Sequence, residues 1–406
     1  MFYTIAFFIL AAGAESAPSF ELHTTGDKPL VGPIQKMATD GSVTLAGQSP
    51  VAGSEVISLR RLSEPVPGWP RTAYMLLHNG DRIVGSPVEI NGAFLNYRAN
   101  AIQRIADEKN EVALRFPLTA ISILWLRAPE SIDRTRYAQT LGDVRADDRL
   151  ILRNGDVLAG VVTSLDSRKG EIQIEKDENR RKVDLGQVVA VAFSTKLARI
   201  RKPAGAYGHL VLKDGTRLSV LTPSIDEGRL TAQTMYRDKL QIDVSAISAI
   251  DIYQGKCVYL SDLKPAKYQY RSYQGEQYNW AADRNLEGQE LQIKSSVDVH
   301  SFDKGIAVHG ECTLVYALDG KYQRFETVVG LDARLGKRGS VELRVLVDGK
   351  EQKVGDGKPL TVESGPWRLR IDVKGAKEIS LIVLWGEGGN VGDHVDWGDA
   401  RLIVNP

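Results

Sequence analysis

The stretch Val341-Glu342-Leu343-Arg344-Val345-Leu346-Val347-Asp348-Gly349 decides the fold class of this chain. Its apolar residues at every second position alternate with Glu342, Arg344 and Leu346, which is the period of a β-strand with one buried face. The Asp348-Gly349 pair then provides a tight turn. Similar apolar runs with Gly-rich turns lie around it, and this rhythm predicts a β-sandwich or jelly roll. These runs are Leu314–Leu318, Arg324–Leu331, Trp367–Val373 and Glu378–Trp385.

An ordered set of short motifs covers the same region. They are Lys304-Gly305-Ile306-Ala307-Val308-His309, Leu314-Val315-Tyr316-Ala317-Leu318, Tyr322-Gln323-Arg324-Phe325, Val329-Gly330-Leu331-Asp332, Gly339-Ser340-Val341-Glu342-Leu343, Asp372-Val373-Lys374-Gly375-Ala376 and Asp393-His394-Val395-Asp396-Trp397-Gly398-Asp399-Ala400-Arg401-Leu402. In this order they resemble the NPCBM family, the novel putative carbohydrate-binding modules found in many bacterial proteins and beside some glycoside hydrolase domains. The resemblance implies a sugar-binding β-sandwich, and it covers only the last third of the chain, residues 258–406.

The region before the sandwich contains internal repeats. In each clear copy an apolar strand runs into Asn-Gly or Asp-Gly and a second strand leaves it, which predicts a hairpin with a two-residue type I′ turn. A further apolar strand then closes each clear copy. The copies are Tyr74–Gly85, Arg149–Gly160 and His209–Leu218, with a degenerate copy at Leu22–Gly32, and the closing strands are Phe116–Leu126, Val183–Phe193 and Leu240–Ile252.

Several short strands per copy predict small, strongly bent β-barrels that resemble SH3-like or Sm-like barrels. Barrels of this size bury little core alone, so we expect neighbouring barrels to pack on each other. The predicted fold is all-β, with tandem small barrels followed by a C-terminal sandwich. The predicted segments are a signal peptide (1–17), a degenerate barrel repeat (20–65), a barrel repeat (70–128), a linker (129–147), two more barrel repeats (148–200 and 205–255) and the sandwich (258–406).

The N-terminus resembles a secretory signal peptide. An apolar run over residues 1–12 is followed by small residues that resemble cleavage sites ending at Ala14 or Ala17. No Lys or Arg precedes the run, which leaves an uncleaved N-terminal anchor as the alternative, and the run is too short to span a bilayer comfortably. We therefore expect a secreted, periplasmic or cell-surface protein with no membrane span after signal cleavage.

The composition excludes some functions and leaves others open. With 43% hydrophobic and 25% charged residues the chain is globular rather than disordered. A net charge of +1 argues against nucleic acid as a partner. The two cysteines, Cys257 and Cys312, could form one disulfide or remain as two buried thiols.

Sugar binding needs a flat aromatic face for the ring and fixed polar groups for the hydroxyls. Trp385 ends an apolar run and enters a glycine-rich loop, and Trp397 lies in the last motif. Core burial is the alternative for both tryptophans, and a satisfied core histidine is the alternative for His309. The predicted carbohydrate-binding residues are His309, Trp385, Glu387, Asn390, His394 and Trp397.

Acidic residues at three-residue steps suggest a calcium site in the last loop. Asp393 and Asp396 are the predicted ligands, because hard carboxylates and loop carbonyls suit Ca²⁺. Asp399 follows at the same step and could instead pair with Arg401.

No serine elbow, phosphate-binding loop or metal triad occurs in the sequence. We therefore predict a non-catalytic protein that binds a glycan or polysaccharide through its C-terminal sandwich. The alternative is a structural or protein-interaction scaffold, in which the sandwich has lost its sugar site and the barrels bind protein at open strand edges.

Overall fold

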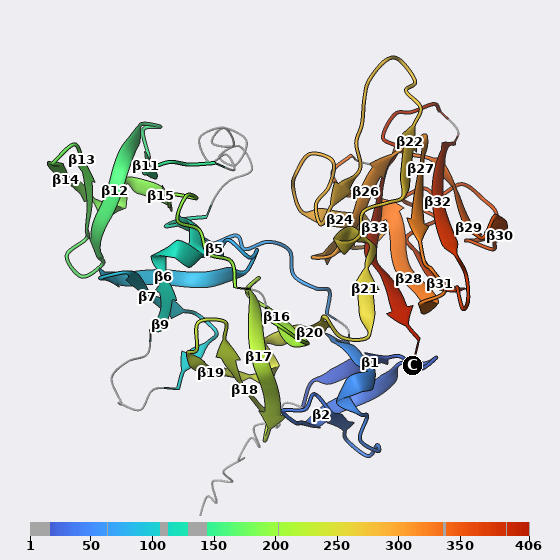
Figure 1. The fold of residues 1–406 in the computed structure, drawn as a ribbon, viewed down its shortest axis with the longest axis horizontal. Helices are drawn as coiled ribbons and strands as arrows, with labels where there is room; N and C mark the ends of the chain where they lie inside the picture. Colours follow the sequence, from blue (N-terminus) through green and yellow to red (C-terminus); the bar gives the residue numbers. More distant parts are fainter. Residues whose placement is uncertain are drawn as a thin grey trace, which may run out of the picture.

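The computed structural model describes residues 17–62, 64–105, 113–128, 144–201, 203–335, 338–386 and 388–405 (Figure 1). Within these ranges the regular elements are β-strands and short 3₁₀ turns, so the predicted all-β class is confirmed. The predicted signal peptide (1–17), except for its last residue, and the predicted linker up to residue 143 lie outside the described residues. No helix in the described ranges is long and apolar enough to cross a membrane.

The C-terminal region is a β-sandwich, as predicted. One sheet has the order β23-β26-β33-β28-β31, with β21 also paired to β33, and the other has the order β22-β27-β32-β29-β30. Their bounds are β21 Cys257–Tyr259, β22 Lys267–Tyr270, β23 Ala281–Ala282, β26 Gly305–His309, β27 Cys312–Ala317, β28 Tyr322–Leu331, β29 Val341–Val347, β30 Lys350–Gln352, β31 Trp367–Asp372, β32 Glu378–Trp385 and β33 His394–Val404. A small two-stranded sheet, β24 (Leu291–Lys294) with β25 (Val299–Phe302), completes this region.

The strand that decided the fold class behaves as its pattern predicts. In β29, Val341, Leu343 and Val345 are buried while Glu342 and Arg344 are exposed. The buried residues belong to one core between the two sheets, which also contains Phe325 and Trp397. This burial provides the main free energy that holds the sheets together.

Before the sandwich, four successive units each fold a meander and pair their last strand with their first. Antiparallel pairs β1–β4, β5–β10, β11–β15 and β16–β20 close the four units. The predicted repeat boundaries, and the standing of these units as separate barrels, stay predictions. Their strands are β1 Ser19–Thr24, β2 Leu30–Met37, β3 Val43–Leu45 and β4 Val56–Arg61; β5 Tyr74–Leu77, β6 Arg82–Asn91, β7 Phe94–Ala99, β8 Gln103–Arg104, β9 Leu114–Pro117 and β10 Ile121–Trp125; β11 Asp148–Leu152, β12 Val157–Asp166, β13 Glu171–Lys176, β14 Asn179–Asp184 and β15 Val188–Ala192; and β16 Tyr207–Leu212, β17 Arg217–Asp226, β18 Arg229–Thr234, β19 Lys239–Asp243 and β20 Ile247–Tyr253.

The hairpin turns differ from the predicted type I′. In the second unit Leu77 and Asp81 close a loop of three residues, and only Gly80 has a positive φ, of 93°. The Asn79 side chain accepts a hydrogen bond from the Asp81 N–H at 3.1 Å, which keeps Asn79 out of the left-handed region. The turn is therefore a three-residue loop with glycine at its left-handed position, and Gly155 and Gly215 repeat it with φ of 92° and 91°.

The closing strands are also interrupted, contrary to the prediction of one continuous strand in each copy. A 3₁₀ turn divides each of them, at residues 118–120, 185–187 and 244–246. In two copies an aspartate caps the turn, since Asp184 accepts from the Gly186 N–H and Asp243 accepts from the Ser245 N–H. The turn redirects the chain so that the last strand can return to the first.

The four units are joined in a nested order. The last strands of the second and third units pair as β10–β15, and those of the first and fourth pair as β4–β20. Leu124 lies opposite Val191 in one pair and Leu59 lies opposite Ile250 in the other. One buried hydrophobic cluster extends from Phe20 to Ile250 through all four units, so the array shares a continuous core.

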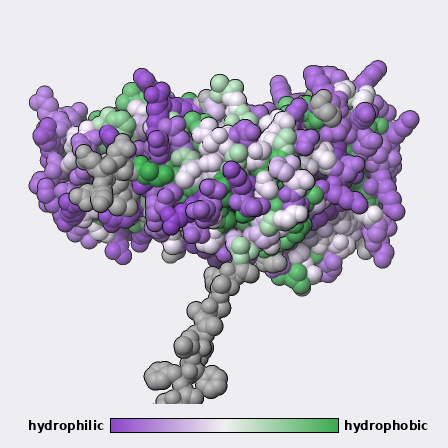
Figure 2. Space-filling view, turned by 90° about the horizontal axis from the view of Figure 1, so that it is seen from below, coloured by the Kyte–Doolittle hydropathy of each residue, from purple (hydrophilic) through white to green (hydrophobic). Residues whose placement is uncertain are grey.

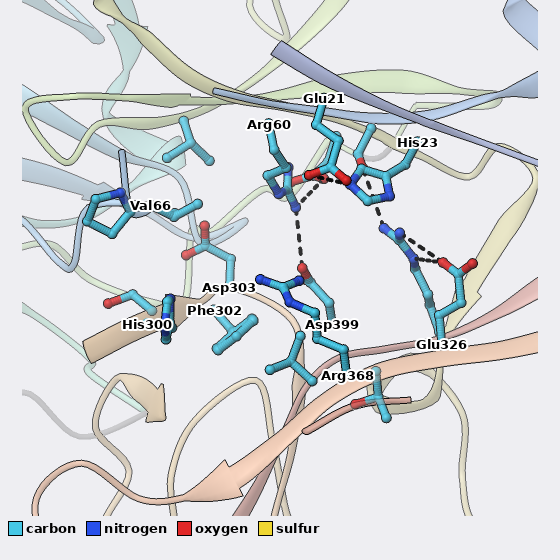
Figure 3. Close-up of a pocket in the computed structure, with 18 of the residues that line it drawn as sticks. Glu21, His23, Arg60, Val66, His300, Phe302, Asp303, Glu326, Arg368 and Asp399 are labelled. Carbon is cyan, nitrogen blue, oxygen red and sulfur yellow. Dashed lines mark hydrogen bonds and ion pairs between the residues drawn. The ribbon is translucent and has the colours of Figure 1, made fainter. Parts of the chain in front are cut away.

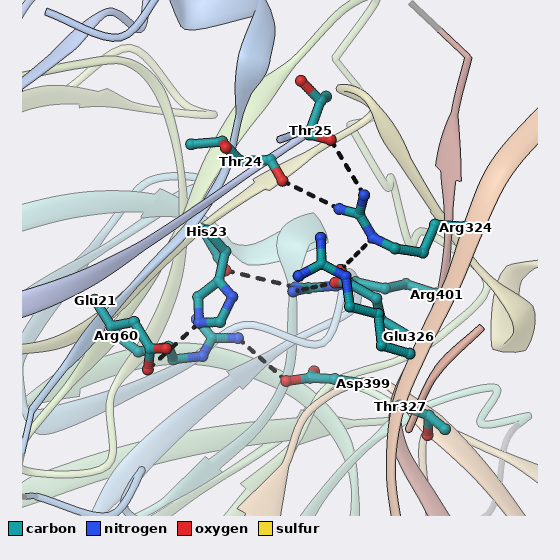
Figure 4. A network of polar contacts seen from close by, with 12 residues as sticks. Glu21, His23, Thr24, Thr25, Arg60, Arg324, Glu326, Thr327, Asp399 and Arg401 are labelled. Atoms are coloured by element: carbon teal, nitrogen blue, oxygen red, sulfur yellow. Dashed lines mark hydrogen bonds and ion pairs between the residues drawn. The ribbon is translucent and has the colours of Figure 1, made fainter. Parts of the chain in front are cut away.

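The sandwich is fixed to the first unit by a buried polar interface (Figure 4). The Arg324 guanidinium donates to the backbone oxygens of Thr24, Thr25 and Gly26 at 3.1–3.4 Å. Arg401 pairs with Glu326 at 3.0 Å within the sandwich and reaches the Ser58 hydroxyl of β4 at 3.5 Å. These contacts hold the sandwich in one orientation on the array.

The face in Figure 2 is mainly hydrophilic, and its hydrophobic residues form small separated patches. Cys257 and Cys312 are both buried free thiols, which is the second of the two alternatives that the sequence left open.

Candidate functional site

Three loops of the sandwich meet at its end away from the C-terminus (Figure 1). They are residues 271–280 after β22, Gly310-Glu311 between β26 and β27, and the loop between β32 and β33. We call the residues that they bring together the aromatic cluster. Its members are Arg271, Tyr273, Glu276, Tyr278, His309, Glu311, Trp385, Asn390 and His394.

Trp385 lies at the centre of the cluster, at the end of β32. The Arg271 guanidinium covers one face of its indole, with the guanidinium carbon 4.7 Å from the ring centroid. The edge of Tyr273 meets the indole at 90°, with the ring centroids 5.1 Å apart. Arg271 is held over the ring by an ion pair of 2.8 Å to Glu311. Tyr273 is 50% exposed, so it offers the most accessible aromatic surface of the cluster.

Glu276 joins two of the loops. Its carboxylate accepts hydrogen bonds from the Gln274 N–H at 2.8 Å and from the Asn390 side-chain amide at 2.7 Å. Backbone hydrogen bonds, first that of Glu276 itself and then that of Gln274, hold the pKa of Glu276 below its usual value. Glu276 is therefore an anion at neutral pH that fixes the position of the Asn390 side chain.

Two histidines and a tyrosine stack beneath these loops. His309 and His394 are paired residues of β26 and β33, and their ring centroids lie 4.9 Å apart. The Tyr278 ring stacks on His309 with a centroid distance of 4.2 Å and an interplanar angle of 6°. Burial, with a smaller contribution from His309, lowers the pKa of His394 to about 4, and burial also lowers the pKa of His309. Both imidazoles are therefore neutral at pH 7, each with one donor and one acceptor nitrogen.

Four of the residues predicted to bind sugar thus come together: His309, Trp385, Asn390 and His394. Trp397 does not join them, because it is fully buried in the sandwich core. Core packing, the alternative that the sequence left open, accounts for this tryptophan. Glu387 lies outside the described residues.

Sequence reasoning missed the loop before β23. Arg271, Tyr273, Glu276 and Tyr278 all come from residues 271–280, more than thirty residues before His309 in the chain. The only signal in the sequence was the Tyr-rich composition of this stretch. It has no strand periodicity that would indicate which side chains face the rest of the sandwich.

The two predicted calcium ligands are both buried. One Asp393 oxygen accepts from the Ser340 N–H at 3.1 Å, and burial raises the pKa of Asp393 to about 6. Neither Asp396 oxygen has a hydrogen-bond partner, and burial first and Asp332 second raise its pKa well above the usual value. Among the described residues no group of three or more His, Cys, Asp or Glu side chains could hold a metal ion. Calcium stays a prediction, and carbonyl oxygens would have to complete its ligand set.

Comparison with known proteins finds similarity in the region of the sandwich. Residues 256–403 match the NPCBM/NEW2 domain. The solved CBM51 module of Clostridium perfringens GH95, in complex with methyl-galactose, is 27% identical; the match covers 36% of this chain and 99% of that chain, with a TM-score of 0.33. A Clostridium perfringens ZmpB structure with the CBM51-2 domain in complex with GlcNAc and INT domains is 23% identical; the match covers 59% of this chain and 45% of that chain, with a TM-score of 0.34. No curated protein matches the chain.

Proposed function

Since residues 256–403 are an NPCBM/NEW2 domain, we propose that this protein binds carbohydrate through the aromatic cluster of its sandwich. The observation that carries the proposal is the meeting of Tyr273, Trp385 and Arg271 on one surface with a fixed amide at Asn390. An exposed ring beside immobilised polar groups is the arrangement that sugar recognition requires.

Each residue has a role in this proposal. The half-exposed Tyr273 ring provides the stacking face, and Trp385 supports both Tyr273 and Arg271 from below. The Arg271 guanidinium donates to sugar hydroxyls, and the Asn390 amide, held by Glu276, contributes a carbonyl oxygen. The neutral imidazoles of His309 and His394 form the floor without adding charge.

Binding without catalysis fits the charges of the cluster. Glycoside cleavage needs one carboxylic acid that can donate a proton, and this requires a raised pKa. Glu276 instead has a lowered pKa, and Glu311 is engaged by Arg271. We therefore propose a non-catalytic protein, exported by its N-terminal segment and active outside the cytoplasm.

A glycan array of the full chain tests this function. We expect wild type to bind a defined set of glycans and Tyr273→Ala to lose about tenfold or more in affinity, because a stacked aromatic ring contributes more than 1 kcal/mol. Val391→Ala is the matched control, since Val391 is an exposed residue of the β32–β33 loop. Equal binding by Tyr273→Ala and wild type would remove the aromatic cluster as the site. The absence of any glycan signal from folded protein would favour the alternative, a protein-interaction scaffold.

A further inference from the structure

A cavity lies between the array and the sandwich, and it shares no lining residue with the aromatic cluster (Figure 3). It has a volume of about 650 Å³, within the range of about 300–1,000 Å³ typical of small-molecule sites. Strands β1 and β4 of the first unit and β16 and β20 of the fourth form one wall, and β25, β28, β31 and β33 of the sandwich form the other. The cavity therefore exists only because the two parts are docked.

Most charges that line this cavity are already paired. Arg60 contacts Asp251 at 2.6 Å and Asp399 at 3.5 Å, and so links the fourth unit to the sandwich. Arg401 pairs with Glu326 at 3.0 Å. These groups hold the walls in place, and their carboxylates keep lone pairs that can accept from hydroxyl groups.

Arg368 is the exception. It projects from β31 into the cavity (Figure 3), and among the described residues its side chain makes no hydrogen bond or ion pair. The other lining arginines all have such partners. Arg368 lies close enough to His23 and His300 for its charge to lower the pKa of both, after the larger effect of burial. The unpaired guanidinium of Arg368 is therefore the group of this cavity that can bind an anion, and the two neutral imidazoles add no competing charge.

The same cavity has an apolar wall. Val66, Phe302 and Pro366 line it together with Leu369. The Phe302 ring packs against the backbone of Gly398, which holds the ring in place. A side chain at position 398 would not fit there, because its β-carbon would lie 2.6 Å from the ring. A ligand of this cavity therefore needs hydroxyl groups for the carboxylates, an apolar face for Phe302 and an anionic group for Arg368.

We propose that the cavity is a second ligand site, specific for a saccharide that carries a carboxylate, such as a uronic acid unit. Its carboxylate pairs with Arg368, a contact for which the planar guanidinium is suited. Its hydroxyls donate to Asp303 and Asp399 on the cavity walls. The site is distinct from the aromatic cluster, and it stands or falls independently of the function proposed above.

Isothermal titration calorimetry on the full chain tests this site. The probes are trimers of galacturonic, glucuronic and mannuronic acid, with their methyl esters as uncharged controls. We expect at least one acid trimer to bind, its ester to bind about tenfold more weakly or not at all, and Arg368→Gln to abolish the difference. The matched control is Arg344→Gln, because Arg344 is an exposed arginine on the other sheet.

Tyr273→Ala separates the two sites. This variant should bind the acid trimer as wild type does, because Tyr273 does not line the cavity. The proposal is overturned if none of the three acids binds, if acid and ester bind equally, or if Arg368→Gln retains the preference. A loss in Tyr273→Ala with no loss in Arg368→Gln would also overturn it, and would place the acidic sugar in the aromatic cluster.

Discussion

Arg271 lies over the indole of Trp385, with its guanidinium carbon 4.7 Å from the ring centroid, and Glu311 holds it there at 2.8 Å. The side chain of Arg271 is nevertheless 68% exposed. A residue this exposed contributes little to folding, yet its position is fixed, which is expected of a group that meets a ligand.

Arg271→Ala should therefore separate binding from stability. We expect the free energy of unfolding to change by less than about 1 kcal/mol, because exposed ion pairs contribute little. Affinity for the glycan found on the array should fall about tenfold through loss of a charge-assisted hydrogen bond. Calorimetric titration and thermal melting check the two quantities, with Arg344→Ala as the control. An unchanged affinity would show that Arg271 only covers Trp385.

The buried His394 predicts a pH dependence of stability. Its pKa is about 4 in the folded state and about 6.5 in the unfolded state, so the unfolded state binds the proton first as pH falls. Stability should therefore be lost between about pH 6.5 and 4, by up to about 3 kcal/mol. His394→Gln should remove this contribution and so reduce the loss of stability between pH 7 and pH 5, as measured by urea denaturation at the two pH values.

The titration of Asp393 changes the stability in the opposite direction over part of this pH range. Its folded pKa of about 6 is raised, so its contribution is present below about pH 4 and is lost as pH rises through 6. In His394→Gln the Asp393 effect remains together with the losses from the buried His23 and His309, so this variant should lose less stability than wild type on acidification from pH 6. A wild-type slope in the variant would show that His394 does not titrate as described.

Asp396→Asn should stabilise the protein at pH 7. Both Asp396 oxygens are buried without hydrogen-bond partners, and burial first and Asp332 second raise its pKa, so the ionised carboxylate destabilises the folded state at neutral pH. The neutral amide avoids this cost, so the variant should melt at a higher temperature at pH 7. The difference should vanish near pH 4, where the unfolded carboxyl is also protonated.

The same variant tests calcium. If Asp396 were a ligand, wild type would melt at a lower temperature in EDTA and at a higher temperature after calcium is added back. Asp396→Asn would then be destabilised at pH 7 and insensitive to the chelator. That pair of results would assign the loop to Ca²⁺ and contradict the expected gain in stability on removing the Asp396 charge.

Arg324→Ala should loosen the sandwich from the array. Only 8% of its side chain is exposed, and it bonds three backbone oxygens of the first unit. Loss of these charge-assisted bonds should cost about 2–4 kcal/mol. We expect trypsin to cleave faster after Lys256, which lies between β20 and β21, and calorimetry to resolve two transitions. A single unchanged transition would show that the remaining contacts suffice.

The sequence pattern predicted many of the strands and turns, because these elements depend on residues that are close together in the chain. The alternation of β29 and the strand–turn rhythm predicted the sandwich, and the three clear hairpins have their glycines at the turns, at Gly80, Gly155 and Gly215. The position of Trp385 at the end of an apolar run, before a glycine-rich loop, predicted part of the aromatic cluster. Loop 271–280 was missed because irregular segments carry no periodicity that shows where they fold.

Long-range contacts could not be predicted in the same way. The pairing of β4 with β20 joins residues about 190 positions apart, and the cavity depends on how two domains dock. Trp397 shows that local sequence does not decide whether an aromatic residue is buried. It has polar neighbours in the sequence and yet belongs to the core of the sandwich.

The nested pairing of the four units sets an order of assembly. The second and third units are neighbours in the chain and can join through β10 and β15 as soon as both are made, whereas β4 must wait for β20. During synthesis the edge of β4 therefore stays open longest, and an open strand edge invites pairing with another chain. The inner pair of units can therefore form before the outer pair, and the sandwich, which comes last in the chain, can contact the first unit only after it is made.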